Sequence, residues 1–233
     1  MDALVYASVF VFLVIRPFVI QTFYIPSGSM IQTLQIQDYI VANKWIYRWR
    51  EPQHGEIVVF KPPQRALRPG EEGTDFIKRV IGLPGDVIEI KNNVLYRDGK
   101  PVDEPYKVFT RMDHADPRKF YNLTPEEMAN YPVIDFKLVN DNGKYIPLNI
   151  RGDDVNYPGT GLSADEYSVS DPVDMARLKA LPSAKIPNGY LLMMGDNRNG
   201  SFDSRGWGLV KREDVIGRSE FIFVPFNRWR MTR

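Results

Sequence analysis

The 233-residue chain contains no cysteine and only two histidines. The absence of cysteine excludes thiol nucleophiles, disulfide scaffolds and cysteine-ligated zinc sites. His54 precedes a predicted strand and His114 lies in a polar segment, so neither has the setting of a serine-histidine-aspartate hydrolase. Two histidines also disfavour a metal enzyme. We therefore expect no metal ion and no cofactor.

An excess of charge of either sign is also missing. The chain has 30 Lys and Arg against 29 Asp and Glu, a formal net charge of +1. This balance gives no indication of a nucleic-acid partner, and we expect none. At 43% hydrophobic residues the chain has ordinary material for a packed core, in one large domain or two small ones.

Long apolar runs are rare, and the one that could span a membrane is at the N-terminus. Residues 3–15 carry no charge, and the apolar character resumes after Arg16-Pro17. A helix of about 18 residues spans roughly 27 Å, close to the ~30 Å of a hydrocarbon core. A secretory signal or a buried helix are the alternatives, but a basic start and a small-residue cleavage site are both missing. The run predicts a retained membrane anchor over residues 1–22.

Short segments rich in β-branched and aromatic residues, separated by turn signals, follow this run. Asn92-Asn93 and Asp98-Gly99 are typical hairpin turns. The expected strands cover residues 39–42, 56–60, 76–81, 87–90, 94–96, 190–194 and 221–224. This pattern predicts a mainly β fold, a coiled or closed antiparallel sheet with little helix outside the anchor.

The composition changes between residues 97 and 185. This stretch is polar and is broken by many Pro, Asn and Gly residues. Within it, Thr124 and Pro125 are typical of an N-cap and a first helical position, and predict a helix start at 124–129. We expect residues 97–185 to be an inserted β-rich subdomain packed on a catalytic β core of residues 23–96 and 186–233.

Two segments carry candidate chemistry. Ser27-Gly28-Ser29 places hydroxyl groups directly after the anchor, and Lys78 lies in an otherwise apolar strand. A serine hydroxyl is a poor nucleophile without a base. Apolar surroundings lower the pKa of a lysine by up to about 3 to 5 units, which makes it a base near neutral pH. Taken alone, the first segment is more often a solvated turn and the second a lysine that faces water.

Three segments together resemble the sequence boxes of bacterial type I signal peptidase. They are residues 25–30, 77–86 and 195–208, in that order and behind an anchor. The resemblance implies a signal-peptidase β fold and a membrane-anchored serine endopeptidase. Such an enzyme removes signal peptides from exported preproteins by cutting after Ala-X-Ala, through an acyl-enzyme intermediate. The implied partners are signal peptides and the lipid bilayer. The implied location is the bacterial cytoplasmic membrane, with the catalytic domain on its outer face.

The resemblance also implies the role of each site residue. Ser29 attacks the scissile carbonyl and Lys78 accepts its proton. The oxyanion is held by the Ser29 backbone N–H and the Ser27 hydroxyl, with Gly28 between them to turn the backbone and leave room for substrate. The third segment supports the dyad: the hydroxyl of Ser201 orients the lysine amine, and an ion pair lies behind it, made by Asp203 and Arg205.

Apolar residues beside the two catalytic segments are expected to form shallow pockets for small side chains. These residues are Phe23, Ile25, Pro26, Met30, Leu34, Phe76 and Ile77. A cluster of Trp and Arg residues over 45–50 is typical of a membrane interface. We expect the Trp45 to Trp49 loop to insert partly into the bilayer.

The chain departs from the family pattern at two places. Gln32 stands where the pattern has proline, which indicates a looser turn after the nucleophile, and Asn199-Gly200 replaces the usual Asp-Asn. Two alternatives remain open from the sequence. A self-cleaving repressor-type protease uses a related Ser-Lys dyad but brings a helix-turn-helix in place of an anchor. A non-enzymatic membrane-anchored β module is the other.

Overall fold

A computed structural model describes residues 5–6, 9, 19–150 and 172–232. The predicted anchor, residues 1–22, lies mostly outside this part of the chain. Its last three residues, 20–22, form part of a strand instead, because they pair with the strand that follows in sequence. Within the described residues, no helix is both long and apolar enough to cross a bilayer.

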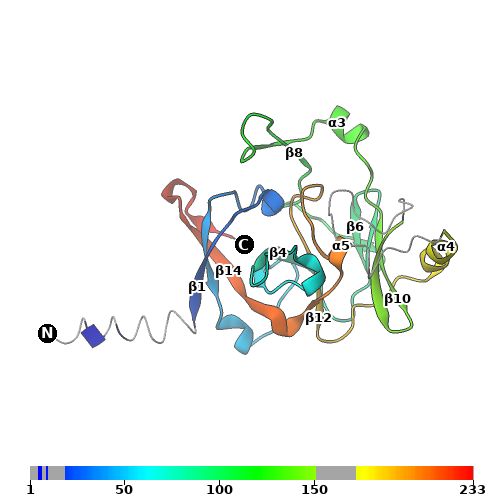
Figure 1. Cartoon of the computed structure of the whole chain (residues 1–233), viewed down its shortest axis with the longest axis horizontal. Coiled ribbons are helices and arrows are strands. Elements are labelled where there is room, and N and C mark those ends of the chain that lie inside the picture. Colours follow the sequence, from blue (N-terminus) through cyan, green and yellow to red (C-terminus); the bar gives the residue numbers. More distant parts are fainter. Residues whose placement is uncertain (1–4, 7–8, 10–18, 151–171, 233) are drawn as a thin grey trace.

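The main sheet is antiparallel and curls around a core (Figure 1). Its strand order is β1-β2-β14-β3-β4-β12-β13, with β15 beside β14. The strands are β1 (Ile20–Tyr24), β2 (Tyr39–Asn43), β3 (Ile57–Phe60), β4 (Phe76–Gly82), β12 (Tyr190–Met194), β13 (Val210–Lys211), β14 (Val215–Val224) and β15 (Arg230–Met231). The mainly β prediction is confirmed.

Strand β14 lies between the β1–β2 and β3–β4 pairs of this sheet although it comes near the end of the chain. One edge pairs with β2, where Ile222 lies opposite Ile40, and the other pairs with β3, where Val215 lies opposite Phe60. Its register shifts along both pairings, and such irregularities bend a strand. β14 therefore joins the N-terminal hairpin β1–β2 to the β3–β4 hairpin.

Both faces of the sheet are covered by apolar clusters. Val58 and Phe60 of β3 belong to one cluster, and Ile57 and Val59 belong to another on the opposite face. All four residues are buried, so β3 appears in the sequence as a continuous apolar run. The expected strands at 39–42, 56–60, 76–81 and 190–194 all lie in this sheet, and 221–224 is the end of the longer β14.

A second antiparallel sheet lies beside the first, in the order β11-β10-β5-β6-β7 (Figure 1). Its strands are β5 (Ile88–Lys91), β6 (Val94–Arg97), β7 (Lys100–Pro101), β10 (Phe136–Asp141) and β11 (Lys144–Asn149). Asn92-Asn93 and Asp98-Gly99 form its turns with positive φ, as predicted. β5 pairs with β10, so this sheet draws strands from both sides of the predicted boundary at residue 97. The division of the chain into core and insertion stays a prediction.

The remaining elements are short. β8 (Thr110–Met112) and β9 (Phe120–Asn122) form a separate hairpin. Thr124 caps α3 with a reciprocal Glu127 capping box, which confirms the predicted helix start. The α-helices are α3 (Pro125–Ala129), α4 (Pro172–Ala180) and α5 (Ser204–Trp207). The 3-10 helices are η2 (Gly28–Met30), η3 (Ile46–Arg48), η4 (Gln64–Ala66), η5 (Arg212–Asp214) and η6 (Phe226–Arg228).

Candidate active site

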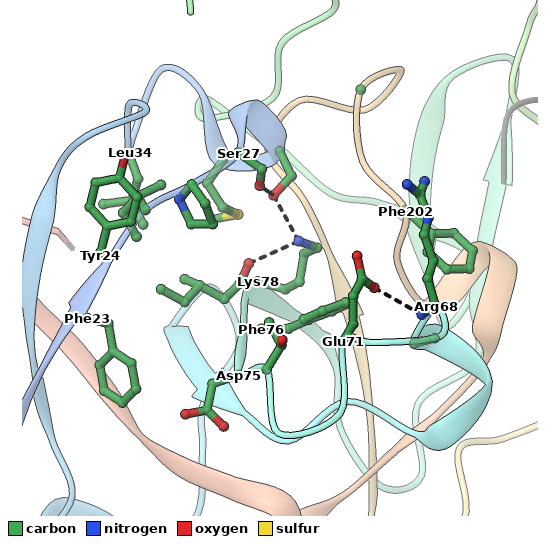
Figure 2. Close-up of a pocket in the computed structure, with 18 residues that line it drawn as sticks. Phe23, Tyr24, Ser27, Leu34, Arg68, Glu71, Asp75, Phe76, Lys78 and Phe202 are labelled. Carbon is green, nitrogen blue, oxygen red and sulfur yellow. Dashed lines mark hydrogen bonds between the residues drawn. The ribbon is translucent and has the colours of Figure 1, made fainter.

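Ser29 and Lys78 lie in hydrogen-bond contact although 49 residues separate them. Lys78 Nζ donates to Ser29 Oγ over 2.8 Å and to the Ile77 carbonyl over 3.1 Å (Figure 2). Ser29 is the middle residue of η2, and Lys78 is on β4 opposite Val58. The structure therefore brings together the two residues that the sequence predicted as nucleophile and base.

Burial gives Lys78 the character that a base requires. The residue is only 5% exposed. Alternate residues of a strand share one face, so Lys78 is on the same face of β4 as Phe76 and Val80, which pack in an apolar cluster. This burial lowers the pKa of the Lys78 amine from 10.5 to about 8, while the carboxylates of Asp203 and Asp196 act in the opposite direction. A lysine with a pKa near 8 is partly neutral at physiological pH and can accept a proton.

Ser27 lies beside the nucleophile on the solvent side. Its Oγ donates to Ser29 Oγ over 3.4 Å, and the residue is exposed. Ser29 is the second residue of η2, where a backbone N–H has no partner within the helix. These two groups are the predicted oxyanion donors, and that role remains a prediction.

The structure indicates a different reason for glycine at position 28 from the tight turn that was predicted. Its φ is not in the left-handed region, so the turn itself does not require glycine. A Cβ here would lie 2.3 Å from Cζ of Phe120, which belongs to the β8–β9 hairpin. The glycine makes room for that aromatic ring rather than for a tight turn.

The third segment supplies the predicted ion pair. Arg205 Nη2 donates to Asp203 Oδ2 over 2.7 Å and Arg205 Nε to Oδ1 over 2.8 Å, with both side chains buried. The Arg205 guanidinium is the main group that lowers the pKa of the Asp203 carboxyl, against an opposing effect of burial. Asp203 also accepts from the backbone N–H of Gly195 over 3.0 Å, which orients the loop that leads into the segment.

Ser201 does not make the predicted hydrogen bond to the lysine amine. Its hydroxyl is buried, and none of the hydrogen bonds of Lys78 in the described residues goes to it. It lies against Gly195, where a Cβ would be 2.3 Å from Ser201 Oγ and 2.5 Å from the Ser29 carbonyl oxygen. Ser201 is thus beside the backbone of the nucleophile, and the prediction of a direct contact with Lys78 is wrong for this geometry.

Two further buried ion pairs were not predicted from the sequence. Arg79, next to Lys78, pairs with Asp196, and Arg198 pairs with Glu104, with every side chain at most 5% exposed. Arg198 Nε also donates to the Gly195 carbonyl over 3.1 Å. The first pair joins β4 to the segment after β12, and the second joins Glu104 to the same segment. Their partners are 117 and 94 residues apart in sequence, so no local pattern indicates them.

A cleft of about 350 Å³ opens beside the dyad (Figure 2). One wall comes from β1 and the residues that follow it, and the other comes from the start of β4 and the loop before it. All seven predicted pocket residues line it: Phe23, Ile25, Pro26, Met30, Leu34, Phe76 and Ile77. Polar residues that the sequence did not indicate also line it, including Arg68, Glu71 and Asp75.

Gln32 is held in place and is not part of a loose turn. Its Nε2 donates to Asn122 Oδ1 over 2.8 Å, and its carbonyl accepts from Arg230 over 3.0 Å. Asn199, at the other departure, bonds the backbone of Thr110 in both directions, over 2.7 and 2.8 Å. The expectation of a looser turn is therefore wrong, because the substituted side chains find partners in the hairpin.

Comparison with known proteins places this site in a family. Residues 1–224 match the family model described as "Signal peptidase, peptidase S26". The chain belongs to the signal peptidase S26 family. A probable signal peptidase I-1 from Synechocystis is 31% identical over 93% of this chain and 78% of its own length. Signal peptidase I from Aquifex aeolicus is 34% identical over 91% of this chain and 78% of its own length.

Membership of the S26 family makes the chain a serine endopeptidase. It decides against the repressor-type protease and the non-enzymatic module that the sequence left open. A crystal structure of a signal peptidase I from Enterococcus faecalis covers 72% of this chain and 97% of its own, with 22% identity and a TM-score of 0.36. Because a TM-score of 0.36 is too low to assign a fold, the description of the fold given above depends only on the strand pairing of this chain.

Proposed function

We propose that this S26 peptidase removes signal peptides by cutting after small residues, with Ser29 as nucleophile and Lys78 as general base. The observation that carries the proposal is the 2.8 Å contact between Lys78 Nζ and Ser29 Oγ, buried at the side of an apolar cleft. The substrate is the end of the signal peptide of an exported preprotein. No cofactor enters the reaction.

The reaction follows from the two side chains. Neutral Lys78 accepts the hydroxyl proton as Ser29 Oγ attacks the scissile carbonyl carbon, which gives a tetrahedral oxyanion. When this intermediate collapses, the ammonium of Lys78 returns the proton to the leaving amine of the mature protein. Ser29 then carries the signal peptide as an ester. Lys78 next takes a proton from the water that attacks the ester carbonyl carbon. When the bond from this carbon to Ser29 Oγ breaks, Lys78 returns the proton to Oγ, and the signal peptide leaves with a carboxyl end.

The oxyanion needs donors that are already in place. We assign this role to the Ser29 backbone N–H and to the Ser27 hydroxyl, which lies 3.4 Å from Ser29 Oγ. A rotation about the Ser27 side chain redirects its O–H from the nucleophile to the oxyanion. Asp203 and Arg205 hold the loop beside the dyad through their buried ion pair.

The cleft has two strand edges that can hold an extended peptide. In the described sheet β1 pairs only with β2, and β12 pairs with β4 only from Arg79 to Gly82. The edge of β4 from Phe76 to Lys78 is therefore open toward the cleft. A peptide bound along such edges points alternate side chains the same way. Residues one and three before the cut then face the apolar pockets, which accounts for Ala-X-Ala.

The anchor places the cleft near a bilayer. Lys44 N donates to the Val19 carbonyl over 2.8 Å, so the end of the predicted anchor lies beside the start of the Trp45 to Trp49 loop. Trp45 is 39% and Trp49 76% exposed. We propose that this loop enters the headgroup region and that residues 1–22 span the bacterial cytoplasmic membrane. The catalytic part then lies on the outer face, where signal peptides emerge.

A cleavage assay tests the function. The full chain in detergent is incubated with a preprotein that ends its signal peptide in Ala-X-Ala, and the cut site is read by mass spectrometry. Ser29→Ala and Lys78→Ala should each abolish the cut. Ser183→Ala and Lys185→Ala, of the same residue types but outside the cleft lining, should not. Cleavage retained in either dyad variant would overturn the assignment.

A further inference from the structure

The β8–β9 hairpin, whose first strand is labelled in Figure 1, contacts the turn that carries the nucleophile through the ring of Phe120. The ring of Phe120 occupies the space that a side chain on Gly28 would fill, at 2.3 Å from the position of a Cβ. Gly28 directly precedes Ser29. An aromatic side chain from the 97–185 segment is thus part of the immediate surroundings of the nucleophile, although the sequence did not indicate it as a site residue.

Hydrogen bonds fix the hairpin relative to Ser29. Asn122 accepts from Gln32 over 2.8 Å, and Thr110 Oγ1 donates to Asn197 Oδ1 over 3.0 Å. Asn197 in turn donates to the carbonyl of Gly28 over 3.1 Å. Gln32 stands where the family pattern has proline, and proline has no side-chain donor. The residue that departs from the pattern therefore helps to hold the hairpin over the nucleophile turn.

The strand register determines which side chains share the face of Phe120. Met112 lies opposite Phe120, and Thr110 lies opposite Asn122. Cross-strand partners and alternate residues point to one face of a hairpin. Met112 is therefore on the same face as Phe120, and Tyr121 is on the other. Met112 is 52% exposed, so an apolar side chain is available beside the ring.

The cleft lies on a different side of Ser29 from this hairpin. None of the hairpin residues lines it, and it extends from Ser29 toward Phe23 and Asp75 (Figure 2). A peptide with its scissile carbonyl at Ser29 Oγ fills this cleft with the residues before the cut. The residues after the cut must leave past Ser29 in the other direction, where Phe120 packs on Gly28.

We propose that Phe120 and Met112 form an apolar wall that contacts the first residues of the mature protein and determines specificity after the cut. The inference rests on the proposed function. An apolar side chain directly after the cut loses water-exposed surface against this wall, which is favourable. A charged one loses hydration against these two apolar side chains, which is costly. The enzyme therefore prefers apolar over charged residues at that position.

Paired peptide substrates test this wall with the full chain in detergent. The peptides share an Ala-X-Ala end and differ only in Leu or Asp directly after the cut. The wild-type chain should favour Leu by about tenfold in kcat/KM, the size expected for one apolar side chain in a pocket. Phe120→Ala and Met112→Ala should each reduce this ratio to within about threefold. Tyr121→Ala, on the opposite face, should leave the ratio unchanged.

A second substrate pair distinguishes a specific loss of selectivity after the cut from a general loss of activity in the variants. These peptides differ in Ala or Leu directly before the cut, and all three variants should discriminate between them as the wild-type chain does. If the wild-type chain cuts none of the peptides, the proposed function fails. If it cuts them and the Leu to Asp ratio of kcat/KM is unchanged in both Phe120→Ala and Met112→Ala, the proposed role of these two residues is wrong. An equal loss on every substrate would make Phe120 a positioning residue for the nucleophile turn instead.

Discussion

Arg79 and Asp196 form a buried ion pair with two hydrogen bonds, of 2.7 Å from Nε and 2.6 Å from Nη2. Arg79 follows Lys78 on β4, and Asp196 lies in the loop that precedes Ser201. Thr33 also donates to Asp196 over 2.5 Å. The pair therefore ties three distant segments together next to the proposed base.

Removal of one partner should destabilise the fold. Asp196→Ala leaves the Arg79 guanidinium buried without its counter-charge, and we expect the free energy of unfolding to fall by about 3 to 5 kcal/mol. The double variant Arg79→Met/Asp196→Leu should recover much of this loss, because no buried charge remains. Urea denaturation measures both. Asp174→Ala, which breaks an exposed pair of 3.4 Å, should cost less than about 1 kcal/mol, and a similar cost for both would contradict the argument.

The pH dependence of cleavage should report Lys78. Its folded-state pKa is lowered to about 8 by burial, and only the neutral amine accepts a proton. The value of kcat/KM should therefore rise with pH through about 8 and level off above it. Asp203 raises the pKa of Lys78, so Asp203→Asn should move this rise to lower pH. If the rise in kcat/KM stays at the same pH or moves to higher pH in this variant, the pH profile does not report the titration of Lys78.

Ser27→Ala should reduce turnover without affecting stability. Loss of one oxyanion donor costs about 10²- to 10³-fold in kcat, and KM should change little because the donor acts in the transition state. Ser27 is exposed, so the melting temperature should stay that of the wild-type chain. Ser27→Thr keeps a hydroxyl and serves as the matched variant. Equal turnover in Ser27→Ala and Ser27→Thr would remove Ser27 from the oxyanion hole.

Gly195→Ala should impair both stability and activity. The added Cβ would lie 2.3 Å from Ser201 Oγ and 2.5 Å from the Ser29 carbonyl oxygen. Such overpacking costs about 1 to 3 kcal/mol. The double variant Gly195→Ala/Ser201→Gly removes the first contact but leaves the second. We expect its melting temperature to recover in part while cleavage stays low, and full recovery of cleavage would show that the Ser29 backbone is not displaced.

Local patterns were sufficient to predict the central strands, whereas the dyad was predicted from the resemblance of three segments taken together. β3 follows directly from its apolar run, and β4 from the apolar residues on both sides of its two charges, Lys78 and Arg79. The expected anchor obscured β1, because Ile20 to Thr22 continue its mostly uncharged sequence. β10 and β11 were not identified, since lysine, asparagine and aspartate leave only short apolar runs in them and Pro147 stands inside β11.

The contacts that shape the site depend on the whole fold. Phe120 lies against Gly28 although 92 residues separate them, and Asn122 meets Gln32 across 90. The Ser201 hydroxyl was assigned to the lysine by resemblance, whereas its position is determined by the space over Gly195. Distances of this kind depend on how strands from opposite ends of the chain pair, which neither composition nor spacing records.

The position of β14 between two strand pairs has a consequence for synthesis of the protein. Ser29 lies in the connection between β1 and β2, and Lys78 lies on β4. In the sheet, β14 (residues 215–224) separates the β1–β2 pair from the β3–β4 pair. A nascent chain carries both reactive groups long before this strand leaves the ribosome. The two reactive groups are therefore brought together only after residues 215–224 are made, and a shorter nascent chain carries the serine and the lysine apart from each other.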